Sequence, residues 1–588
     1  MLQLPTPISY KRSGSASSSH SSHFLLSNVP HSKQPSASIF GISQEHPFAN
    51  YWTTQGGIPE VVGVLPSKEH ADLLVSKYFE AVDPVYPMLD RQRFYADYER
   101  FWALPLQEKQ RVDAAMLALH FAVYAMGAQF IQMDSEQQKA QIAEFYVSAA
   151  HQSLRLYLFL SRTSLKSIQA MILMAYFLMN DNKAADAWAF GGILLRQAYA
   201  MGLNRDPDLI VPHVSAAEKQ SRRKLWQAVY FQDTFLTVLL KLPPTATFAD
   251  VTVDSLTDDP IPDPQAPTLP TDSPAPNTCT NPMSISAIAP PQIASPVQPP
   301  LSVTSVLPPP PSSAMSTAND VAFIRSMWQL ADLVQRNVCF PRALSRPLTT
   351  SPRNKANLLS QFHALYASFP PALTCITPGS FAALLATDTR VARQNLFLRS
   401  NFWHCVMLIE ADENEAGGVK CDVHGALKAG RLALGSFFDF WEGLRVDTGV
   451  WWVFQHRAFE EAVSVVFFFY FLSSLGFALQ PGCGSTLRFS LFPYVILRNC
   501  LSLVWIGLLT VIQLTMASLL ASFSPVPSSP IDGDSVSKVE PLFLEAKDDV
   551  RRALDILEHV ASSAPEMQKT RTEFLRSAFE DIRFRGIM

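Results

Sequence analysis

The chain has 588 residues, of which 48% are hydrophobic, and a formal net charge of −4. This length and apolar content suffice for a large buried core. The near-neutral charge excludes a protein that is basic overall, the usual mark of a dedicated nucleic-acid binder, although a local basic patch remains compatible with it. The seven cysteines form no C-x-x-C pair and no spacing typical of a disulfide framework or a clustered zinc site, which favours a reducing compartment.

Residues 1–45 are rich in serine, histidine and proline and contain hardly any acids. Such a composition buries too little apolar surface to offset the entropy lost on ordering, so we predict a disordered tail. A proline and two basic residues stand where a signal peptide needs a continuous apolar core, which argues against secretion. His20, His23 and His31 could hold a transition metal loosely, but a solvated tail is the preferred interpretation.

An amphipathic helix is predicted from about Ser67, its N-cap, to Pro84, which ends it. Its apolar face contains Ala71, Leu74, Tyr78, Phe79 and Val82. Further apolar periodicities predict helices at about 110–132, 136–159, 164–180, 184–201 and 215–241. Strand-like alternation is almost absent, so we interpret 46–252 as the first half of an all-α, multi-helix domain with antiparallel packing.

The helix at 184–201 carries apolar residues that we expect to face the core, namely Trp188, Ile193, Leu194, Ala198 and Met201. Gly202 suits the left-handed position that closes a helix. Arg205 and Asp206 follow in the connection, where a local ion pair is the simplest interpretation.

Residues 253–318 are rich in proline and have almost no charge after Asp272. Such a segment is typical of an extended, disordered linker. It interrupts the helical domain, whose second half, 319–588, begins with "NDVAFIRSMWQLADLVQRNV" and has a late helix in "EAKDDVRRALDILEHVAS".

Two stretches, "AWAFGGILLRQAYAMGLNRDP" (187–207) and "EKQSRRKLWQAVYFQDTFLTVLLKLPP" (218–244), together resemble the fungal-specific transcription factor regulatory domain, or middle homology region, of the Zn2Cys6-type transcription factors. The matching positions are Ala200, Gly202, Leu203, Arg205, Asp206, Pro207, Glu218, Arg222, Arg223, Leu225, Trp226, Tyr230, Asp233, Leu240, Pro243 and Pro244. "YFEAVDPVYPMLDRQRFYADYERFW" (78–102) is similar to the family's opening helix and turn, and "WWVFQHRAFEEA" (451–462) to its late helix. The resemblance covers about residues 60–462 and the last fifty or so.

Five positions depart from the family pattern: Asn204 replaces His, Lys224 replaces Arg, Gln227 replaces Trp, Thr234 replaces Arg and Lys241 replaces Gly. The order of the segments is kept. The resemblance implies a nuclear regulator of RNA polymerase II genes that is not an enzyme and that acts with the transcription machinery or co-regulators. Family members are often pathway-specific, including regulators of secondary-metabolite clusters. A homodimer, and a small-molecule inducer bound in a cavity between helices, are further options.

The family usually carries a zinc cluster ahead of this domain, whereas the first cysteine here is Cys279. No thiolate upstream of the helical part can therefore bind structural zinc. Either the product contacts DNA through a partner, without a module of its own, or the sequence lacks an N-terminal exon. Zinc is expected only with such a missing cluster.

The apolar segment 463–523 interrupts the family pattern. Between Glu461 and Lys538 the charged residues are Arg488, Arg498, Asp532 and Asp534. "LSLVWIGLLTVIQLTMASLLASF" reaches the length of about 20 residues that crosses a bilayer. Three interpretations stay open: a translated intron, since Val463-Ser464 can be encoded by a splice-donor-like string, a pair of buried core helices, and a membrane span, the least favoured. The competing functional hypothesis is a helical binding or scaffold protein, with or without attachment to a membrane through 463–523.

The common motifs of hydrolases, zinc proteases and nucleotide enzymes are absent, so no catalytic, cofactor or metal residue is assigned. His404-Cys405 and Cys421-x-x-His424 could combine into a mixed metal site, but we prefer Cys405 packed in a core and His424 facing solvent. The run Arg222-Arg223-Lys224 could touch phosphate, although an exposed face or a face that pairs with another helix is the commoner use of such a run.

Overall fold

The computed structural model describes residues 46–256 and 313–478, apart from a few single positions, together with 541–561 and several residues between 572 and 580. Regular structure in these residues is helical, with an isolated β-bridge between Asn414 and Val419. The all-α prediction is confirmed for this part of the chain. The tail predicted at 1–45, nearly all of the linker predicted at 253–318, and residues 479–523 of the apolar segment lie outside the described residues.

The first half contains the predicted helices in their predicted order. Its elements are α3 (Gly57–Val62), α4 (Lys68–Lys77), the π-helix η1 (Tyr78–Val82), α5 (Arg91–Ala103), α6 (Leu106–Lys109), α7 (Ala114–Phe130), α8 (Glu136–Tyr157), α9 (Leu165–Asn180), α10 (Ala184–Ala200), α11 (Pro207–Ile210), α12 (Ala216–Leu240) and the 3-10 helix η2 (Phe248–Asp250). The caps explain several starts: Ser135, Ser164 and Ser215 each accept the backbone N–H three residues later. Helix α7 is buried on nearly every side and packs against α4, α8 and α9.

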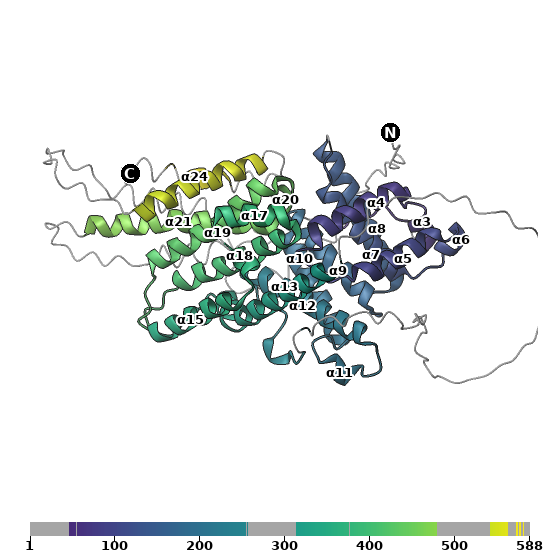
Figure 1. Ribbon diagram of the computed structural model, residues 1–588, viewed down its shortest axis with the longest axis horizontal. Coiled ribbons are helices and arrows are strands. Elements are labelled where there is room, and N and C mark those ends of the chain that lie inside the picture. Colours follow the sequence, from purple (N-terminus) through teal and green to yellow (C-terminus); the bar gives the residue numbers. More distant parts are fainter. Residues whose placement is uncertain are drawn as a thin grey trace, which may run out of the picture.

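The second half is also helical in the residues described. Its elements are α13 (Ser313–Val334), the π-helix η3 (Gln335–Cys339), α14 (Phe340–Ala343), α15 (Pro352–Ser368), α16 (Pro371–Thr374), α17 (Pro378–Thr387), α18 (Thr389–Glu410), α19 (Val423–Gly443), α20 (Arg445–Val450), α21 (Trp452–Ala478) and α24 (Pro541–Ala561). Helices α18, α19 and α21 pack together, and α24 lies over α19 and α21 (Figure 1).

The start of the domain follows the sequence prediction closely. The Ser67 hydroxyl accepts the N–H of His70 and caps α4. All five residues predicted on the apolar face of this helix are buried. The helix widens into η1 and ends at Val82, just before Asp83 and Pro84, because proline lacks the backbone N–H that a continuing helix needs.

Helix α10 ends as predicted, although one of its core residues is misassigned. Gly202 has φ of +66°, its N–H donates to Tyr199 O, and the next N–H donates to Ala198 O, as in a Schellman motif. Leu194 and Ala198 are buried, while Trp188 and Met201 are half-buried against the core. The prediction for Ile193 is wrong: it is 39% exposed, and Leu195 is buried instead. Ile193 falls on the stripe with Ala189, Arg196 and Ala200, which faces away from α9 and α12.

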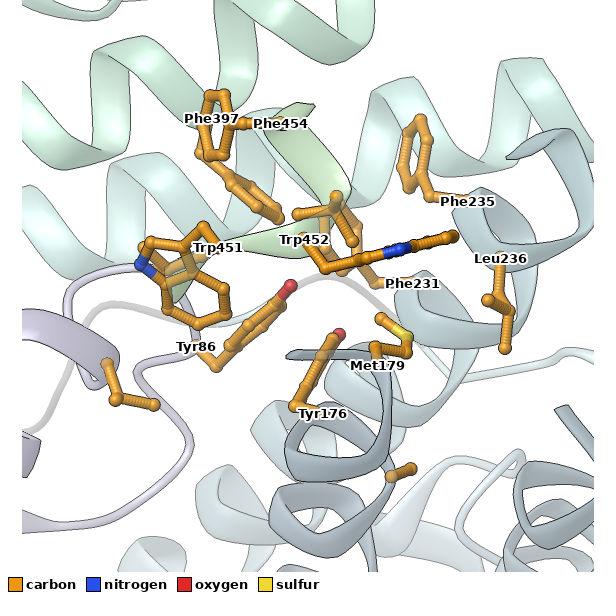
Figure 2. Close-up of a cluster of buried hydrophobic side chains, with 14 of the residues drawn as sticks. Tyr86, Tyr176, Met179, Phe231, Phe235, Leu236, Phe397, Trp451, Trp452 and Phe454 are labelled. Carbon is orange, nitrogen blue, oxygen red and sulfur yellow. The ribbon is translucent and has the colours of Figure 1, made fainter. Parts of the chain in front are cut away.

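The two halves lie end to end along the long axis and meet where α12 packs beside α13 (Figure 1). Their contact is centred on rings that we call the aromatic junction: Tyr86, Tyr176, Phe231, Phe397 and Trp451 (Figure 2). The Tyr86 ring stacks on Tyr176 with centroids 3.7 Å apart. It meets Phe397 and Trp451 edge-on at 5.3 and 5.8 Å, and Phe231 at 6.0 Å. Because the first half supplies three of these rings and the second half two, one hydrophobic core runs through both halves.

Helix α24 runs antiparallel to α21 and parallel to α19. Near its start, Glu545 and Asp549 pair with Arg431 of α19, at the level of Val465 of α21, which lies against Gly430. Near its end, Leu557 and Val560 face Trp452 and Phe459 at the start of α21. The C-terminal end of α21 and the N-terminal end of α24 are therefore at the same end of this helix layer.

Trp451→Ala tests whether the aromatic junction holds the halves together. Trp451 is 1% exposed and contacts both Tyr86 and Phe130 of the first half. The cavity left by the indole should lower the free energy of unfolding by about 3–5 kcal/mol. Urea unfolding followed by far-UV circular dichroism measures this loss, which should appear as a shift of one cooperative transition.

Leu209→Ala is the matched control, because Leu209 is 81% exposed. It should change the free energy of unfolding by less than about 0.5 kcal/mol. A loss below about 1 kcal/mol for Trp451→Ala, far less than large-to-small core changes cost, would contradict the role given to this ring.

Candidate functional site

The sequence segments that carry the resemblance converge on α12. Polar contacts occur at the start, in the middle and at the end of this helix, and they join it to 202–208, to 245–246 and to α21. We call these three sets of contacts the α12 polar network. They determine how α12 sits against the rest of the domain.

At the start of α12, Arg223 is buried against the short helix α11. Its Nη2 lies 3.1 Å from Asp206 Oδ1 and 2.5 Å from Asp208 Oδ2. Asp206 also caps α11 by accepting the N–H of Asp208. Hydrogen bonds from Lys219 and Arg223 lower the pKa of Asp208. The ion pair expected for Asp206 therefore exists, but its partner is Arg223 on the next helix, and Arg205 is exposed.

In the middle of the network, Asn204 and Asp233 bind the segment 245–253, which follows α12. The Asn204 side chain donates to Asp250 O at 2.7 Å, and the backbone carbonyl of Asn204 accepts the N–H groups of Thr252 and Val253. The Asp233 carboxylate accepts the N–H of Thr245 at 3.1 Å and that of Ala246 at 2.9 Å. Gln335 of the second half donates to the same carboxylate at 3.4 Å. Burial raises the pKa of Asp233 to about 6, although these donors act in the opposite direction.

At the end of α12, Lys241 occupies the position where the family usually has glycine. Its φ of +55° lies in the left-handed region that glycine adopts without strain. Its ammonium lies 3.7 Å from Glu460 of α21. Arg342 donates to the last-turn carbonyl of Val238 at 2.7 Å and lies 3.5 Å from Glu460. The buried carboxylate of Glu460 thus ties the end of α12 to the second half.

Two histidines complete the surroundings of Glu460. His404 of α18 has Nε2 3.4 Å from Glu460 and Nδ1 3.1 Å from Glu461. His456 lies one turn before Glu460, at 4.0 Å. All four side chains are buried. Burial alone would raise the pKa of Glu460, but Lys241, His404 and Arg342 outweigh it and hold that pKa well below its ordinary value.

A separate ion triad crosses between the halves near the aromatic junction. Arg390 of α18 lies 2.6 Å from Asp83, which follows η1, and 2.8 Å from Asp320 of α13. Gln394 also donates to Asp320, at 2.7 Å. Asp83 is 2% exposed, and burial raises its pKa to about 6 against the attraction of Arg390.

Comparison with known proteins agrees with this arrangement of motifs. Residues 75–287 match the model of the family described as "Fungal specific transcription factor domain". This part of the chain is thus similar to fungal specific transcription factor domains. The matched range contains α12 and the whole polar network of the first half, whereas Glu460 and His404 lie beyond it.

The relatives are fungal transcription factors. Zn(2)-C6 fungal-type transcription factor mpsB of Macrophomina phaseolina is 28% identical over 192 residues, covering 31% of this chain and 25% of the relative. Transcription factor opdR of Penicillium oxalicum is 26% identical over 206 residues, or 35% of this chain and 24% of the relative. Sorbicillinoid biosynthetic cluster transcription factor 2 of Penicillium rubens is 26% identical over 193 residues, or 31% of this chain and 28% of the relative. The chain spans about a quarter of the length of these relatives.

Within the matched range 75–287, the basic run Arg222-Arg223-Lys224 has arginines that pair with neighbouring acids. Arg222 lies 3.4 Å from Glu218 one turn earlier, and Arg223 is occupied by Asp206 and Asp208. Arg223 therefore pairs with a neighbouring helix, as the preferred interpretation expects, whereas Arg222 pairs within α12.

The residues considered for a mixed metal site have other surroundings. Cys405 is buried in the core, where burial raises the pKa of its thiol to about 12, and His404 faces Glu460 and Glu461. Cys421 is half-buried and His424 is exposed. Within the described residues, no group of three or more His, Cys, Asp or Glu could hold a metal ion. His20, His23 and His31 lie outside the described residues.

A small cavity lies between α21 and α24. It is lined by Trp452, Gln455, His456, Phe459, Leu557, Val560 and Thr572, and its volume is about 20 Å³. Such a volume holds a water molecule but not a metabolite. The inducer site expected between helices therefore stays a prediction.

The membrane interpretation of 463–523 is addressed only in part. In the part of the chain that the structure describes, no helix combines the length and apolarity that crossing a bilayer requires. The 23-residue stretch "LSLVWIGLLTVIQLTMASLLASF" is outside that part.

Sequence reasoning missed the buried cluster around Glu460. One signal was available: "FQHRAFEE" places charged residues at helical spacing inside a helix whose other residues are mostly apolar. Charges on such a helix cannot all face water, so they need buried partners. The partners themselves, Lys241, Arg342 and His404, come from three distant segments that no local pattern connects.

Lys241→Gly separates backbone strain from the charge contact with Glu460. Glycine should relieve about 1 kcal/mol of left-handed strain, but loss of the ammonium leaves a buried carboxylate with one partner fewer, which costs more. We expect a net loss of about 1–3 kcal/mol in the free energy of unfolding, measured by urea titration. Lys241→Met keeps the strain and removes the charge, so it should be less stable than Lys241→Gly by about 1 kcal/mol. A Gly variant as stable as the wild type would refute the ion contact.

Asp233→Asn tests the raised pKa of Asp233. A carboxyl whose folded pKa of about 6 exceeds its ordinary value of 3.8 favours folding at low pH, and this contribution is lost as pH rises through that window. The asparagine variant lacks the titration. The free energy of unfolding of the wild type minus that of Asp233→Asn should therefore fall by about 1–3 kcal/mol between pH 4 and pH 7.

Asp208→Asn is the control of opposite sign, because the pKa of Asp208 is lowered in the folded protein. The stability of the wild type relative to this variant should rise with pH. A pH-independent difference for Asp233→Asn would contradict the prediction.

Proposed function

We propose that this chain is the regulatory part of a nuclear transcription regulator that controls RNA polymerase II genes. The observation that carries the proposal is the match of residues 75–287 to the fungal specific transcription factor domain, with relatives that are transcription factors. The geometry supports it, because the family-like polar residues bind each other and backbone groups in the interior. Such an arrangement suits a domain that holds or changes its conformation, and we assign it no catalytic step and no cofactor.

The regulator is proposed to be pathway-specific. The printed name of one relative assigns it to a sorbicillinoid biosynthetic cluster, and by analogy the targets here are genes of a secondary-metabolite cluster. The name of another relative includes Zn(2)-C6. DNA contact is accordingly proposed to be made through an N-terminal zinc-cluster module or through a partner protein.

The α12 polar network is proposed to couple the two halves of the regulator. Glu460 of α21 and Gln335 of η3 both bind at α12, so a change in the packing of the second half alters the support of α12. A co-regulator bound on one half can then be sensed by the other through the same contacts.

A tethering assay tests the proposed function. The full chain is fused to a heterologous DNA-binding domain and expressed in a fungal host with a reporter gene behind the matching operator. The fusion should change reporter transcription by about threefold or more, in either direction, relative to the DNA-binding domain alone. Trp451→Ala should abolish the change, and Leu209→Ala should preserve it. A folded, nuclear fusion without effect on the reporter would overturn the proposal.

Localisation provides an independent test. The tagged full-length chain should accumulate in the nucleus. Sedimentation with membranes would instead support the alternative of a scaffold attached through 463–523.

A further inference from the structure

The connection between α8 and α9 presents two leucines to solvent. Leu158 is 61% exposed and Leu160 is 72% exposed. Leu158 also closes α8 with φ of +61°, a left-handed conformation that favours glycine. Leu158 therefore departs from two common patterns at once: large apolar side chains are mostly buried, and a positive φ is mostly adopted by glycine. Such departures concentrate at functional sites.

Phe159 anchors this connection to the domain. Its ring packs on the core, 6.3 Å from the ring of His151. Its carbonyl accepts a hydrogen bond of 2.5 Å from the Gln197 side chain on α10. This contact places the outer stripe of α10 beside the connection, including the exposed Ile193 one turn before Gln197. The three exposed apolar side chains are therefore held on rigid elements.

Three exposed arginines accompany the apolar residues: Arg155 in the last turn of α8, Arg162 in the connection and Arg196 on α10. The Arg162 guanidinium lies 4.7 Å from the centroid of the Tyr157 ring. Arg155 also suits the C-terminal dipole of α8. In the described part of the chain, none of the three pairs with a carboxylate.

The chain supplies few acids to this region. No acid occurs between Glu144 and Asp181, or between Asp186 and Asp206. Asp113 precedes Ala114 and Ala115, which pack on Tyr157, but its carboxylate is occupied as the N-cap of α7. The surface thus combines apolar side chains with positive charge.

We propose that Leu158, Leu160 and Ile193, together with Arg155, Arg162 and Arg196, form a docking surface for an acidic amphipathic segment of a partner protein. The apolar face of the segment covers the leucines, and its carboxylates pair with the arginines. A second copy of this chain fits poorly, since a two-fold interface would bring the arginines of both copies together. Nucleic acid fits poorly because its phosphates offer nothing to the leucines. This surface is independent of the proposed DNA contact and goes beyond the proposed function.

Binding is measured by fluorescence anisotropy with the full-length chain and a labelled helical peptide. The probe carries Leu on one face and Glu or Asp on the other. Three comparison probes have Lys in place of the acids, Ser in place of the leucines, or a labelled DNA duplex in place of the peptide. The acidic amphipathic peptide should bind at least about tenfold more tightly than each of the other probes. Added salt should lower its affinity, because salt screens the contacts between carboxylates and arginines.

Leu158→Gly is the decisive variant, because it removes the apolar side chain and also relieves the left-handed strain. It should raise the urea midpoint of unfolding and lower the affinity for the peptide by about tenfold. A loss of binding then cannot be attributed to misfolding. Arg162→Glu combined with Arg196→Glu should weaken binding and remove its salt dependence. The matched controls Leu209→Ser and Arg353→Glu change an exposed leucine and an exposed arginine elsewhere and should leave binding unchanged.

Three results would overturn the proposal. The first is peptide affinity that Leu158→Gly leaves unchanged. The second is stronger binding of the basic peptide or of the DNA duplex than of the acidic peptide. The third is a wild-type dimer in light scattering that Leu158→Gly converts to a monomer, which would assign the surface to a second copy.

Discussion

The stack of Tyr86 on Tyr176, with Phe231, Phe397 and Trp451 around it, is the contact on which the architecture depends. The chain leaves the first half after Leu256 and begins its next described helix at Ser313. Sequence proximity therefore does little to hold the halves together, and burial of apolar rings must do so. Arg390 adds specificity beside the rings, because it must face Asp83 and Asp320 at once. The rings supply most of the affinity between the halves, and the triad fixes their orientation.

The polar network around Glu460 has a different character from the aromatic junction. Burying a carboxylate is costly, and an isolated ion pair often only offsets that cost. Here the carboxylate has cationic or imidazole neighbours from four elements, so each neighbour is difficult to replace. This arrangement explains why a lysine is compatible with the left-handed position at the end of α12. The backbone strain at Lys241 is small compared with the cost of leaving Glu460 without that ammonium.

Local patterns predicted the helices well, because periodicity and capping act within a few residues. Ser67 as a cap and Gly202 as a helix end both follow from backbone geometry that the sequence alone specifies. Ile193 was misplaced because an apolar residue on a helix is not always turned toward the core, and its orientation depends on which neighbours pack there. The partners of Asp206, Asp233 and Glu460 could not be predicted from local patterns, because they lie at distant positions in the sequence. The resemblance of a few short segments to a known family could therefore indicate a regulatory domain without revealing which contacts hold it together.

The antiparallel course of α21 and α24 has a consequence for the chain between them. Because α21 ends and α24 begins at the same end of this helix layer, a segment that connects them leaves the layer and re-enters it at that end. After the first half, Arg325 of α13 binds the carbonyl of Leu256, which places the end of the first half beside the middle of that helix. Chain closure costs little extra for a longer loop, so a connection that leaves and re-enters the helix layer at one end can differ in length without disturbing α21 and α24.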